Sequence, residues 1–414
     1  MDKRRVVITG IGTINPIGAN AAETWASVKE GKCGIAPITH FDTTDFKVKL
    51  AAEVKEFDLA AILGAKEAKR MDRFTQFACA AAKEAFEDSG INMEYEDASK
   101  CGCIVSSGIG GLSTIVSEHT KGEERGYAKV SPFFIPMSIT NMSAGQIAIM
   151  FGLKGMCSCV VTACASSNNA IGDAFHRVRD GYEDVMLCGG SEAVINKLAI
   201  AGFQIMKALC TSEDPMRASI PFDKERHGFV MGEGAGILVL EEYEHAVKRG
   251  AKIYAEICGY GANCDAHHIT APHPEGEGAS ACMQLALDDA GMKAGEIDYI
   301  NAHGTSTELN DAGETKAIKK TFKDHAYKLM VSSTKSMTGH LIGGAGAVEA
   351  IITALALKEG FVPATVNYRV PDENCDLDIV PNTGRNVEIK AALSNALGFG
   401  GHNASIILRK VTEA

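Results

Sequence analysis

Short runs of apolar and β-branched residues alternate with Ala-rich amphipathic stretches along most of the chain. The first apolar run is RRVVITGIG at residues 4–12, and the spacing of apolar positions predicts a helix over Phe74–Glu87. Further strand-like runs lie at 101–111, 157–167 and 184–194, and a helical pattern covers 168–178. This βαβ rhythm favours a mainly parallel sheet covered by helices.

The rhythm restarts at about Gly236. Strand-like and amphipathic stretches alternate again at 234–250, 251–261, 279–290, 297–305, 328–336, 347–360 and 394–410. Two α/β halves in series are the economical interpretation, the first at 1–250 and the second at 251–414. Three stretches look irregular, namely Ile38–Lys55, Thr120–Ser138 and Asp265–Gly278, and loops of this length are often lids or binding loops.

The composition is that of a globular protein, with 46% hydrophobic and 22% charged residues among 414. The formal net charge of −11 at pH 7 argues against nucleic acid and against an anionic membrane surface as partners. A local basic patch could still meet an acidic protein. The start, MDKRRVVITGIG, has too short an apolar run for a signal peptide, and no run reaches the ~18 residues of a membrane span.

The 13 cysteines are scattered and lack the paired CxxC spacing of zinc sites. Their odd number also argues against a disulfide framework. We therefore expect reduced thiols in a cytoplasmic protein that does not insert into a membrane.

Cys164 is the candidate nucleophile among these cysteines. In VVTACASSNNA an apolar run gives way to small residues and then to a helical pattern. A thiol at a helix N-terminus is predicted to be stabilised as thiolate by the helix dipole and free backbone N–H groups. Considered alone, a cysteine is far more often a buried inert thiol.

Two histidines follow strand-like runs in the second half. His303 lies in YINAHGTST, and His340 lies in VSSTKSMTGHLIGGAGA, five residues after Lys335. Imidazoles at strand ends can donate hydrogen bonds to a bound carbonyl, and a nearby lysine can tune their pKa. Each is weak evidence alone, because single histidines are more often structural.

Together these segments resemble the signature blocks of the β-ketoacyl-acyl-carrier-protein synthases, in order and in spacing. The blocks are TACASS, NAHGTST, SSTKSMTGHLIGGAGAVE and GFGGHN, the last around Phe399. The resemblance covers essentially the whole chain, and EEYEHAVKRGAKIYAE and the C-terminal SIILRK are most similar to the type II, elongating members of bacterial fatty-acid synthesis. It implies a thiolase fold, with two similar halves in a five-layered αβαβα arrangement, a homodimer, and an active site between the halves.

The resemblance also implies roles for residues. Cys164 would carry the acyl chain, His303 and His340 would stabilise an enolate from Nε2, and the N–H groups of Cys164 and Phe399 would form an oxyanion hole, with the Phe399 ring as a gate. Lys335 would lie in a charge network with Asp311 and Glu314 as partners. A monovalent cation or water would lie near Asn301, Glu349, Ser394 and Asn395.

Substrate contacts follow from the same resemblance. Ile109 and Phe203 would line an acyl tunnel, although both could be plain core residues. Thr305 and Thr307 would bind the phosphopantetheine arm, with Thr270 and Gly400 as further substrate contacts. Lys66, Lys69 and Arg70, spaced as one helix face, and Lys207 would meet an acidic acyl carrier protein, although such a run could also be a solvated face. No cofactor is required, because phosphopantetheine arrives on the carrier.

Four alternatives compete with this assignment. Thiolases and chalcone-synthase-type enzymes use Cys-His-Cys or Cys-His-Asn, and His340 argues against both. A non-catalytic chain-length-factor subunit typically lacks the cysteine, which this chain retains. A nucleotide-dependent oxidoreductase would rest on VVITGIGTINPIG, in which Asn15 replaces the third Gly of GxGxxG. A dedicated polyketide ketosynthase would carry the same three catalytic residues and stays open.

Overall fold

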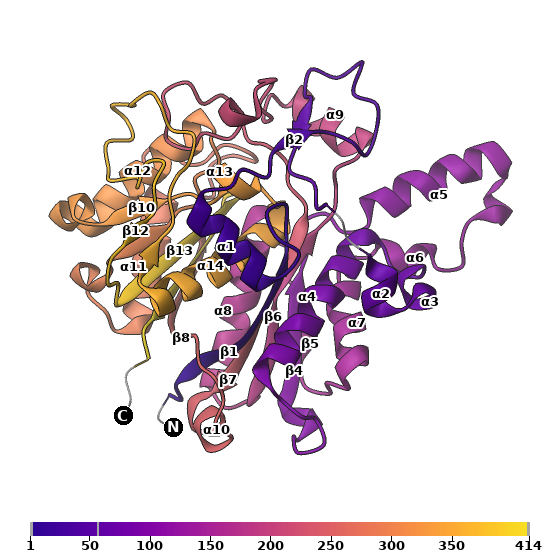
Figure 1. The fold of residues 1–414 in the computed structure, drawn as a ribbon, viewed down its shortest axis with the longest axis horizontal. Coiled ribbons are helices and arrows are strands. Elements are labelled where there is room, and N and C mark those ends of the chain that lie inside the picture. Colours follow the sequence, from indigo (N-terminus) through magenta and orange to yellow (C-terminus); the bar gives the residue numbers. More distant parts are fainter. Residues whose placement is uncertain (1–2, 56–57, 412–414) are drawn as a thin grey trace.

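The computed structural model describes residues 3–55 and 58–411, and ten of its strands form one sheet (Figure 1). These ten strands are β1 (Val6–Ile14), β4 (Cys101–Ser106), β5 (Cys157–Ser158), β6 (Val185–Glu192), β7 (Gly234–Glu242), β8 (Ala255–Cys264), β9 (Tyr299–Asn301), β10 (Met330–Ser332), β13 (Ala391–Gly398) and β14 (His402–Arg409). Two small sheets pair β2 (Ala36–Pro37) with β3 (Leu50–Ala51) and β11 (Phe361–Val362) with β12 (Arg385–Asn386).

The large sheet consists of two five-stranded arrangements with the same order. From the centre outward, the first half runs β1-β7-β6-β4-β5 and the second runs β8-β14-β13-β9-β10. In each half the first two pairings are antiparallel and the last two are parallel. A short antiparallel contact between β1 and β8, with Val6 opposite Ile257, joins the halves. A boundary at residue 250 itself stays a prediction.

The expectation of a mainly parallel sheet is wrong, because the sheet is mixed. Five of its pairings are antiparallel and four are parallel. β14 returns from β13 through a tight turn at Phe399, and strands joined by such a turn must be antiparallel. The apolar runs did not reveal this, because β1, β7 and β14 are buried almost throughout, as parallel strands are.

The helices form three layers around the two halves of the sheet (Figure 1). α4 packs on the outer face of β1, β7 and β6, and α11 packs on the outer face of β8 and β14. α8 and α14 lie between the halves, where each contacts strands of both. The five-layered αβαβα arrangement of the thiolase fold is therefore confirmed.

The helices are α1 (Ala21–Glu30), α2 (Leu59–Leu63), α3 (Ala65–Ala68), α4 (Arg73–Ser89), α5 (Leu112–Arg125), α6 (Phe134–Ser138), α7 (Met142–Phe151), α8 (Ser166–Arg179), α9 (Lys197–Ile205), α10 (Tyr243–Lys248), α11 (Glu277–Ala290), α12 (Glu308–Phe322), α13 (Lys335–Thr338) and α14 (Ala345–Glu359).

Helix ends follow from local side-chain chemistry. α4 begins where the Asp72 carboxylate accepts a hydrogen bond from Phe74 N, and it ends at Gly90, whose φ of 68° is a left-handed C-cap. α14 is different because nearly every residue of it is buried, which explains its run of Ala, Ile and Leu. The helices predicted near residues 74, 168, 279 and 347 are all present.

Two of the three irregular stretches are as expected. Ile38–Lys55 contains only the short strand β3, and Asp265–Gly276 is a loop before α11. Thr120–Ser138 is partly helical instead, because α5 extends to Arg125 and α6 occupies Phe134–Ser138. Within residues 3–55 and 58–411, no helix combines the length and apolarity needed to cross a bilayer.

Candidate active site

The two central helices begin at the same place, between the halves of the sheet. Cys164 lies in the 3-10 turn η3 (Ala163–Ala165) directly before α8. His340 lies just before the turn η7 (Ile342–Gly344), which leads into α14. The two turns contact each other. The repeated architecture therefore brings a cysteine of the first half next to a histidine of the second.

A cavity of about 560 Å³ opens at this point and is lined by Cys164, His303, His340 and Phe399. The sulfur of Cys164 and one ring nitrogen of each histidine lie within 4.8 Å of one another. In the described part of the chain, no other three His, Cys, Asp or Glu side chains meet this closely. The fold thus brings together the three residues that the sequence assigned to one site.

The turn that carries Cys164 has an unusual backbone and a tight neighbour. Ala163 has a φ of 51°, a left-handed conformation that residues other than glycine rarely adopt. Gly398, at the end of β13, packs directly against the turn. A Cβ there would lie 2.6 Å from Thr162 O and 3.2 Å from Cys164 N. The missing side chain lets β13 approach the nucleophile closely.

The charge state of Cys164 differs from the sequence prediction. Burial raises the pKa of its thiol to about 12, while Lys335 and the backbone N–H groups of Phe399 and Cys164 act in the opposite direction. The helix N-terminus alone predicts a stabilised thiolate, but burial from both halves outweighs it. The thiol is therefore protonated at pH 7 before substrate binds.

His303 is held by backbone and ring contacts. Its backbone N–H and that of Gly304 each donate to a carboxylate oxygen of Glu314, both at 2.8 Å. Lys335 Nζ lies 3.5 Å from His303 Nδ1. Because an ammonium group can only donate, this contact assigns the acceptor role to Nδ1 and the proton to Nε2.

His340 is fixed mainly through its backbone. Its N–H donates to Val230 O at 2.7 Å, and its carbonyl accepts from Gly232 N at 2.8 Å. Its ring packs edge-on against His303 and Phe229, with centroids 5.3 and 5.2 Å away. Burial lowers the pKa of both histidines well below 6.5, and Lys335 acts in the same direction. Both imidazoles are therefore neutral at pH 7, and each has one N–H to donate.

Lys335 forms a buried ion pair with Glu349 of α14. Lys335 Nζ lies 2.5 Å from Glu349 Oε1, and the two residues are only 1% and 2% exposed. Burial raises the pKa of Glu349, while Lys335 opposes this shift. The lysine therefore links the charge of Glu349 to His303.

Asp311 and Glu314 were expected to be the partners of Lys335, and this is wrong. Asp311 accepts from Phe222 N at 2.8 Å and lies 3.5 Å from the guanidinium of Arg226. Glu314 is occupied by the N–H groups at His303 and Gly304. Both lie on α12, whereas the carboxylate partner of Lys335 lies on α14. Burial raises the pKa of Glu314 to about 7, although its hydrogen bonds act to lower it.

One thiol and two imidazoles are also donor types that bind zinc. The ammonium of Lys335 beside His303 disfavours a dication at this position, because like charges repel strongly in a buried site. The arrangement is better suited to stabilising developing negative charge.

Phe399 lies in the turn between β13 and β14 and lines the cavity. Its ring lies 6.3 Å from that of Phe203. Gly400 is not among the residues that line the cavity, and its assignment as a substrate contact stays a prediction. Its N–H instead donates to Ile269 O at 2.8 Å, which ties the turn to the loop Asp265–Gly276.

The remaining predicted substrate contacts do line the cavity. Ile109 and Phe203 pack with Cys164 in one apolar cluster. Thr305 and Thr307 share a hydrogen bond of 2.9 Å between their hydroxyl groups, and Thr270 borders the cavity from the irregular loop. The cavity therefore has an apolar region beside the cysteine and hydroxyl groups beside His303.

The basic residues lie on the surface. Lys207 is exposed and lines the cavity. Lys66, Lys69 and Arg70 are also exposed, but they do not form one helix face, because α3 ends at Ala68. Arg70 lies over the ring of Phe133, 5.0 Å from its centroid.

Several buried polar atoms near Glu349 lack partners among the described residues. They are both side-chain amide atoms of Asn301, Oγ of Ser394 and Oε2 of Glu349. Asn301 and Ser394 are register partners on β9 and β13. Asn395 differs, because it donates to Glu314 and accepts from Ser405. Three of the four predicted residues thus offer the oxygen ligands that fit a small cation.

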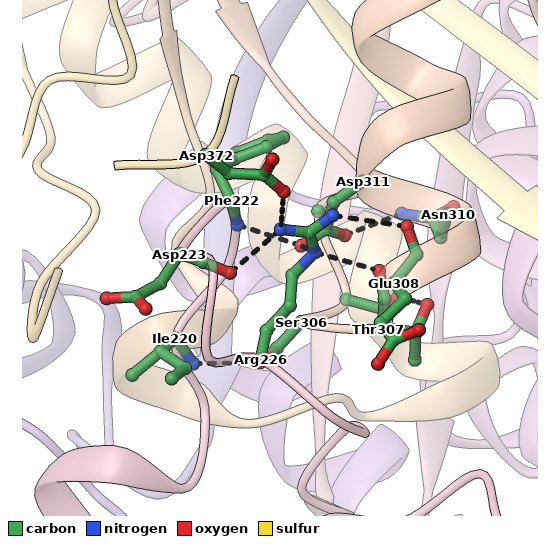
Figure 2. Close-up of polar contacts among 12 residues, drawn as sticks. Ile220, Phe222, Asp223, Arg226, Ser306, Thr307, Glu308, Asn310, Asp311 and Asp372 are labelled. Carbon is green, nitrogen blue, oxygen red and sulfur yellow. Dashed lines mark hydrogen bonds and ion pairs between the residues drawn. The ribbon is translucent and has the colours of Figure 1, made fainter. Parts of the chain in front are cut away.

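Two buried ionisable residues beside the site do not stand out in the sequence. Glu192 accepts hydrogen bonds from Ser107, Gly108 and Gly343, and so joins the two loops beside Ile109 and Ile342. Arg226 lies behind Thr307, surrounded by carbonyl and carboxylate oxygens (Figure 2). Both lie in segments rich in charge and glycine, GGSEA and DKERHGF, but only the fold reveals that these charges are buried.

Comparisons with known protein families match two domains. The model of the β-ketoacyl synthase N-terminal domain matches residues 3–246, and that of the C-terminal domain matches residues 254–369. Two curated relatives are both called 3-oxoacyl-[acyl-carrier-protein] synthase 2. The protein from Synechocystis sp. is 50% identical over 99% of each chain, and that from Staphylococcus aureus is 51% identical over 98% of each.

Solved ketosynthase structures are similar to this chain over nearly its whole length. The ishigamide ketosynthase/chain length factor superposes with a TM-score of 0.93 at 37% identity, over 99% of this chain and 100% of that one. A type II polyketide synthase acyl-carrier protein in complex with its ketosynthase, bound to the hexaketide, gives a TM-score of 0.92 at 33% identity and the same coverage.

Proposed function

This chain belongs to the β-ketoacyl synthase family, and from that membership we infer that it is a 3-oxoacyl-[acyl-carrier-protein] synthase of the elongating type. It joins a cysteine-bound acyl chain to malonyl-acyl-carrier protein, releases CO₂ and lengthens the chain by two carbons. The observation that carries the proposal is the meeting of Cys164, His303 and His340 on one cavity wall.

The first step is acyl transfer. Cys164 attacks the thioester carbonyl of an acyl-carrier protein, a new carbon–sulfur bond forms, and the carrier's own carbon–sulfur bond breaks. The carrier sulfur leaves as a thiol and takes up the proton that Cys164 loses. The negative oxygen of the intermediate accepts hydrogen bonds from Cys164 N and Phe399 N, both of which lie close to the sulfur.

The second step forms the carbon–carbon bond. Malonyl-carrier protein loses CO₂, and the electron pair of the broken bond moves onto the thioester as an enolate. His303 and His340 each donate one N–H to the enolate oxygen. Both imidazoles are neutral, and each carries one N–H for this hydrogen bond. The enolate carbon then attacks the acyl-cysteine, the carbon–sulfur bond to Cys164 breaks, and the thiolate that leaves takes up a proton from solvent water.

Lys335 acts through charge and position. Its contact with His303 Nδ1 keeps the His303 proton on Nε2, where the enolate oxygen forms. Its pairing with Glu349 fixes the ammonium group in place. We assign it no proton transfer.

The cavity walls suggest how substrate lies. Ile109 and Phe203 take the acyl chain, and Phe399 acts as the gate between acyl and malonyl binding. Thr305 and Thr307 bind the pantetheine amides, with Thr270 from the loop opposite. Lys207, Lys66, Lys69 and Arg70 meet the acidic carrier protein, a partner that one ketosynthase relative has in its solved structure.

A monovalent cation would be held by Asn301, Ser394 and Glu349. It would bind the Glu349 oxygen that Lys335 does not contact. No other cofactor is needed in this scheme, because phosphopantetheine arrives on the carrier protein.

A homodimer is supported by the edge strand β5 and the apolar side chains around it. Ile139, Ile149, Met156 and Val161 are all more than two-fifths exposed. An unpaired edge beside exposed apolar residues favours pairing with a second copy. A cytoplasmic location is supported by 13 cysteines that are all free.

Incubation with radiolabelled medium-chain acyl-carrier protein and malonyl-carrier protein tests the proposal. Wild type should become labelled and release β-ketoacyl product, whereas Cys164→Ala should take no label. The pair His303→Ala/His340→Ala should take label but release little product. A wild type that neither takes label nor decarboxylates malonyl-carrier protein would indicate a non-catalytic partner subunit. A preference for very long or oxidised chains would indicate a polyketide enzyme.

A further inference from the structure

Arg226 is a buried cation directly behind the cavity wall. It is only 4% exposed, and its guanidinium reaches several acceptors at once (Figure 2). Nε donates to Thr307 O at 3.3 Å, and Nη2 donates to Glu308 O at 3.2 Å. Two consecutive carbonyls at the start of α12 are therefore held by one planar group.

Carboxylates balance the charge of this arginine. Nη1 lies 2.5 Å from Asp372 Oδ2, and Nε lies 3.5 Å from Asp311 Oδ2. Nη1 also donates to the backbone carbonyl of Asp223 at 2.8 Å. A lysine could supply the charge, but its single ammonium could not reach both carbonyls of α12 and both carboxylates together.

The same segment that carries Arg226 wraps around the loop Gly304–Glu308. Ile220 N donates to Ser306 Oγ at 2.9 Å, and Gly228 N donates to Ser306 O at 3.0 Å. Ser306 has a φ of 69°, in the left-handed region that favours glycine. A serine keeps this backbone because the contacts on both sides fix it.

This loop presents Thr305 and Thr307 to the cavity. It follows His303 directly, and Glu314 on α12 holds the backbone of His303. Asp311, one turn earlier on α12, faces Arg226 and accepts from Phe222 N. Arg226 therefore contacts Thr307 and α12 directly, and it is linked to Thr305 through the hydrogen bond between the two threonine hydroxyl groups.

We propose that Arg226 is a positioning residue for the pantetheine arm, which sets the placement of Thr305 and Thr307 through the carbonyls of Thr307 and Glu308. This inference rests on the proposed function, since the arm is that of the carrier protein. Arg226 touches no substrate itself. It determines how well the two threonines meet the arm, and so it acts on substrate affinity more than on bond formation.

Arg217 provides a matched control. It also pairs with Asp223, through two contacts of 3.1 Å, and donates to Asn367 O at 2.8 Å. Among the described residues it makes no hydrogen bond or ion pair with the loop Gly304–Glu308. Arg217→Lys and Arg226→Lys therefore both weaken arginine contacts of the same segment, from a half-buried and a buried side chain respectively, but only the second releases the loop.

The experiment measures KM and kcat with acyl- and malonyl-carrier protein for both lysine variants. It also measures the Tm and the rate at which iodoacetamide, which lacks the arm, alkylates Cys164, read by mass spectrometry of the Cys164 peptide. Arg226→Lys should raise KM roughly tenfold, which corresponds to ~1.4 kcal/mol of lost binding free energy. It should lower kcat less than about threefold. The alkylation rate should stay unchanged, and Arg217→Lys should leave KM within about twofold of wild type.

Ser306→Gly provides a second variant in case Arg226→Lys does not fold. Glycine adopts the left-handed backbone easily but lacks the hydroxyl that accepts from Ile220 N, so the loop is released without unpairing a buried charge. It should also raise KM while the alkylation rate stays constant.

Three results would overturn the inference. The first is an unchanged KM in Ser306→Gly and in folded Arg226→Lys, and the second is an equal rise of KM in Arg217→Lys. The third is a fall in kcat and in alkylation rate without a change in KM, which would place the effect in the reacting groups. A wild type that takes no label would refute the proposed function, and the inference with it, whereas active wild type with normal variants refutes the inference alone.

Discussion

Replacing Lys335 by methionine tests how the buried ion pair with Glu349 balances charge in the site. Methionine matches the length of the aliphatic stem but leaves Glu349 without its counter-charge, and Glu349 Oε2 already has no partner among the described residues. Loss of one member of a buried pair costs about 3–5 kcal/mol. At ~2.1 cal/mol/K per residue, this chain of 414 residues unfolds with an entropy of about 0.9 kcal/mol/K, so the Tm should fall by about 3–6 °C.

The loss should depend on pH, and its sign follows from Glu349. Burial raises the pKa of this carboxyl group while Lys335 opposes the shift, so the pKa rises further once the lysine is removed. A raised pKa in the folded state means that stability is retained at low pH and lost as pH rises toward that pKa. The deficit should therefore grow by up to ~1.4 kcal/mol for each pH unit as pH rises above the ordinary pKa of a glutamate.

Calorimetry at matched protein concentration measures both effects. Lys335→Met/Glu349→Gln removes both charges and should recover most of the lost Tm and its pH dependence. Malonyl decarboxylation should stay low in both variants, because His303 Nδ1 has lost its donor. Lys224→Met, which breaks the exposed pair with Glu373, should shift the Tm by less than about 1 °C. A double variant no more stable than the single one would refute the reasoning.

Three further predictions concern the groups around the nucleophile. Glu314→Gln should lower kcat about tenfold in the condensation assay, because the amide NH₂ would face an N–H of His303 or Gly304; an unchanged kcat would show that this anchor is dispensable. Alkylation of Cys164 by iodoacetamide should accelerate about tenfold per pH unit from about pH 7 to about pH 9, because burial raises its pKa to about 12; a plateau near neutral pH, read from the Cys164 peptide, would contradict that shift. Gly398→Ala should lower kcat by about 10²–10³, because a Cβ 2.6 Å from Thr162 O must displace the N–H groups of Phe399 and Cys164. Gly202→Ala meets no atom within 4 Å and should keep activity, so equal losses in both variants would rule out this cause.

Much of the fold follows from the order of apolar and amphipathic stretches. The central helices α8 and α14 and the outer helices α4 and α11 lie where their periodicity predicts them. Strand direction did not follow, because a buried antiparallel strand such as β7 carries the same continuous apolar run as a parallel one. Only the tight turn at Phe399 marks one antiparallel pair in the sequence.

The sequence also predicted only part of the candidate site. Cys164, His303 and His340 stand out because each follows a strand-like run and precedes small residues. The partner of Lys335 could not be found this way. Asp311 and Glu314 are near His303 in sequence, but Lys335 on α13 pairs with Glu349 on the next helix, α14. Which carboxylate meets the lysine depends on how these helices pack, and local spacing does not encode that.

The charge state of Cys164 makes the same point in energetic terms. Its position before α8 predicts a lowered pKa, and the N–H groups and Lys335 do act in that direction. Residues of both halves, however, enclose Cys164 at the cavity. This enclosure removes the water that would stabilise a thiolate. The same enclosure keeps His303 and His340 neutral. A site assembled between two repeated halves is therefore suited to charge that develops on the substrate, where donors are already in place, rather than to charge stored on its own side chains.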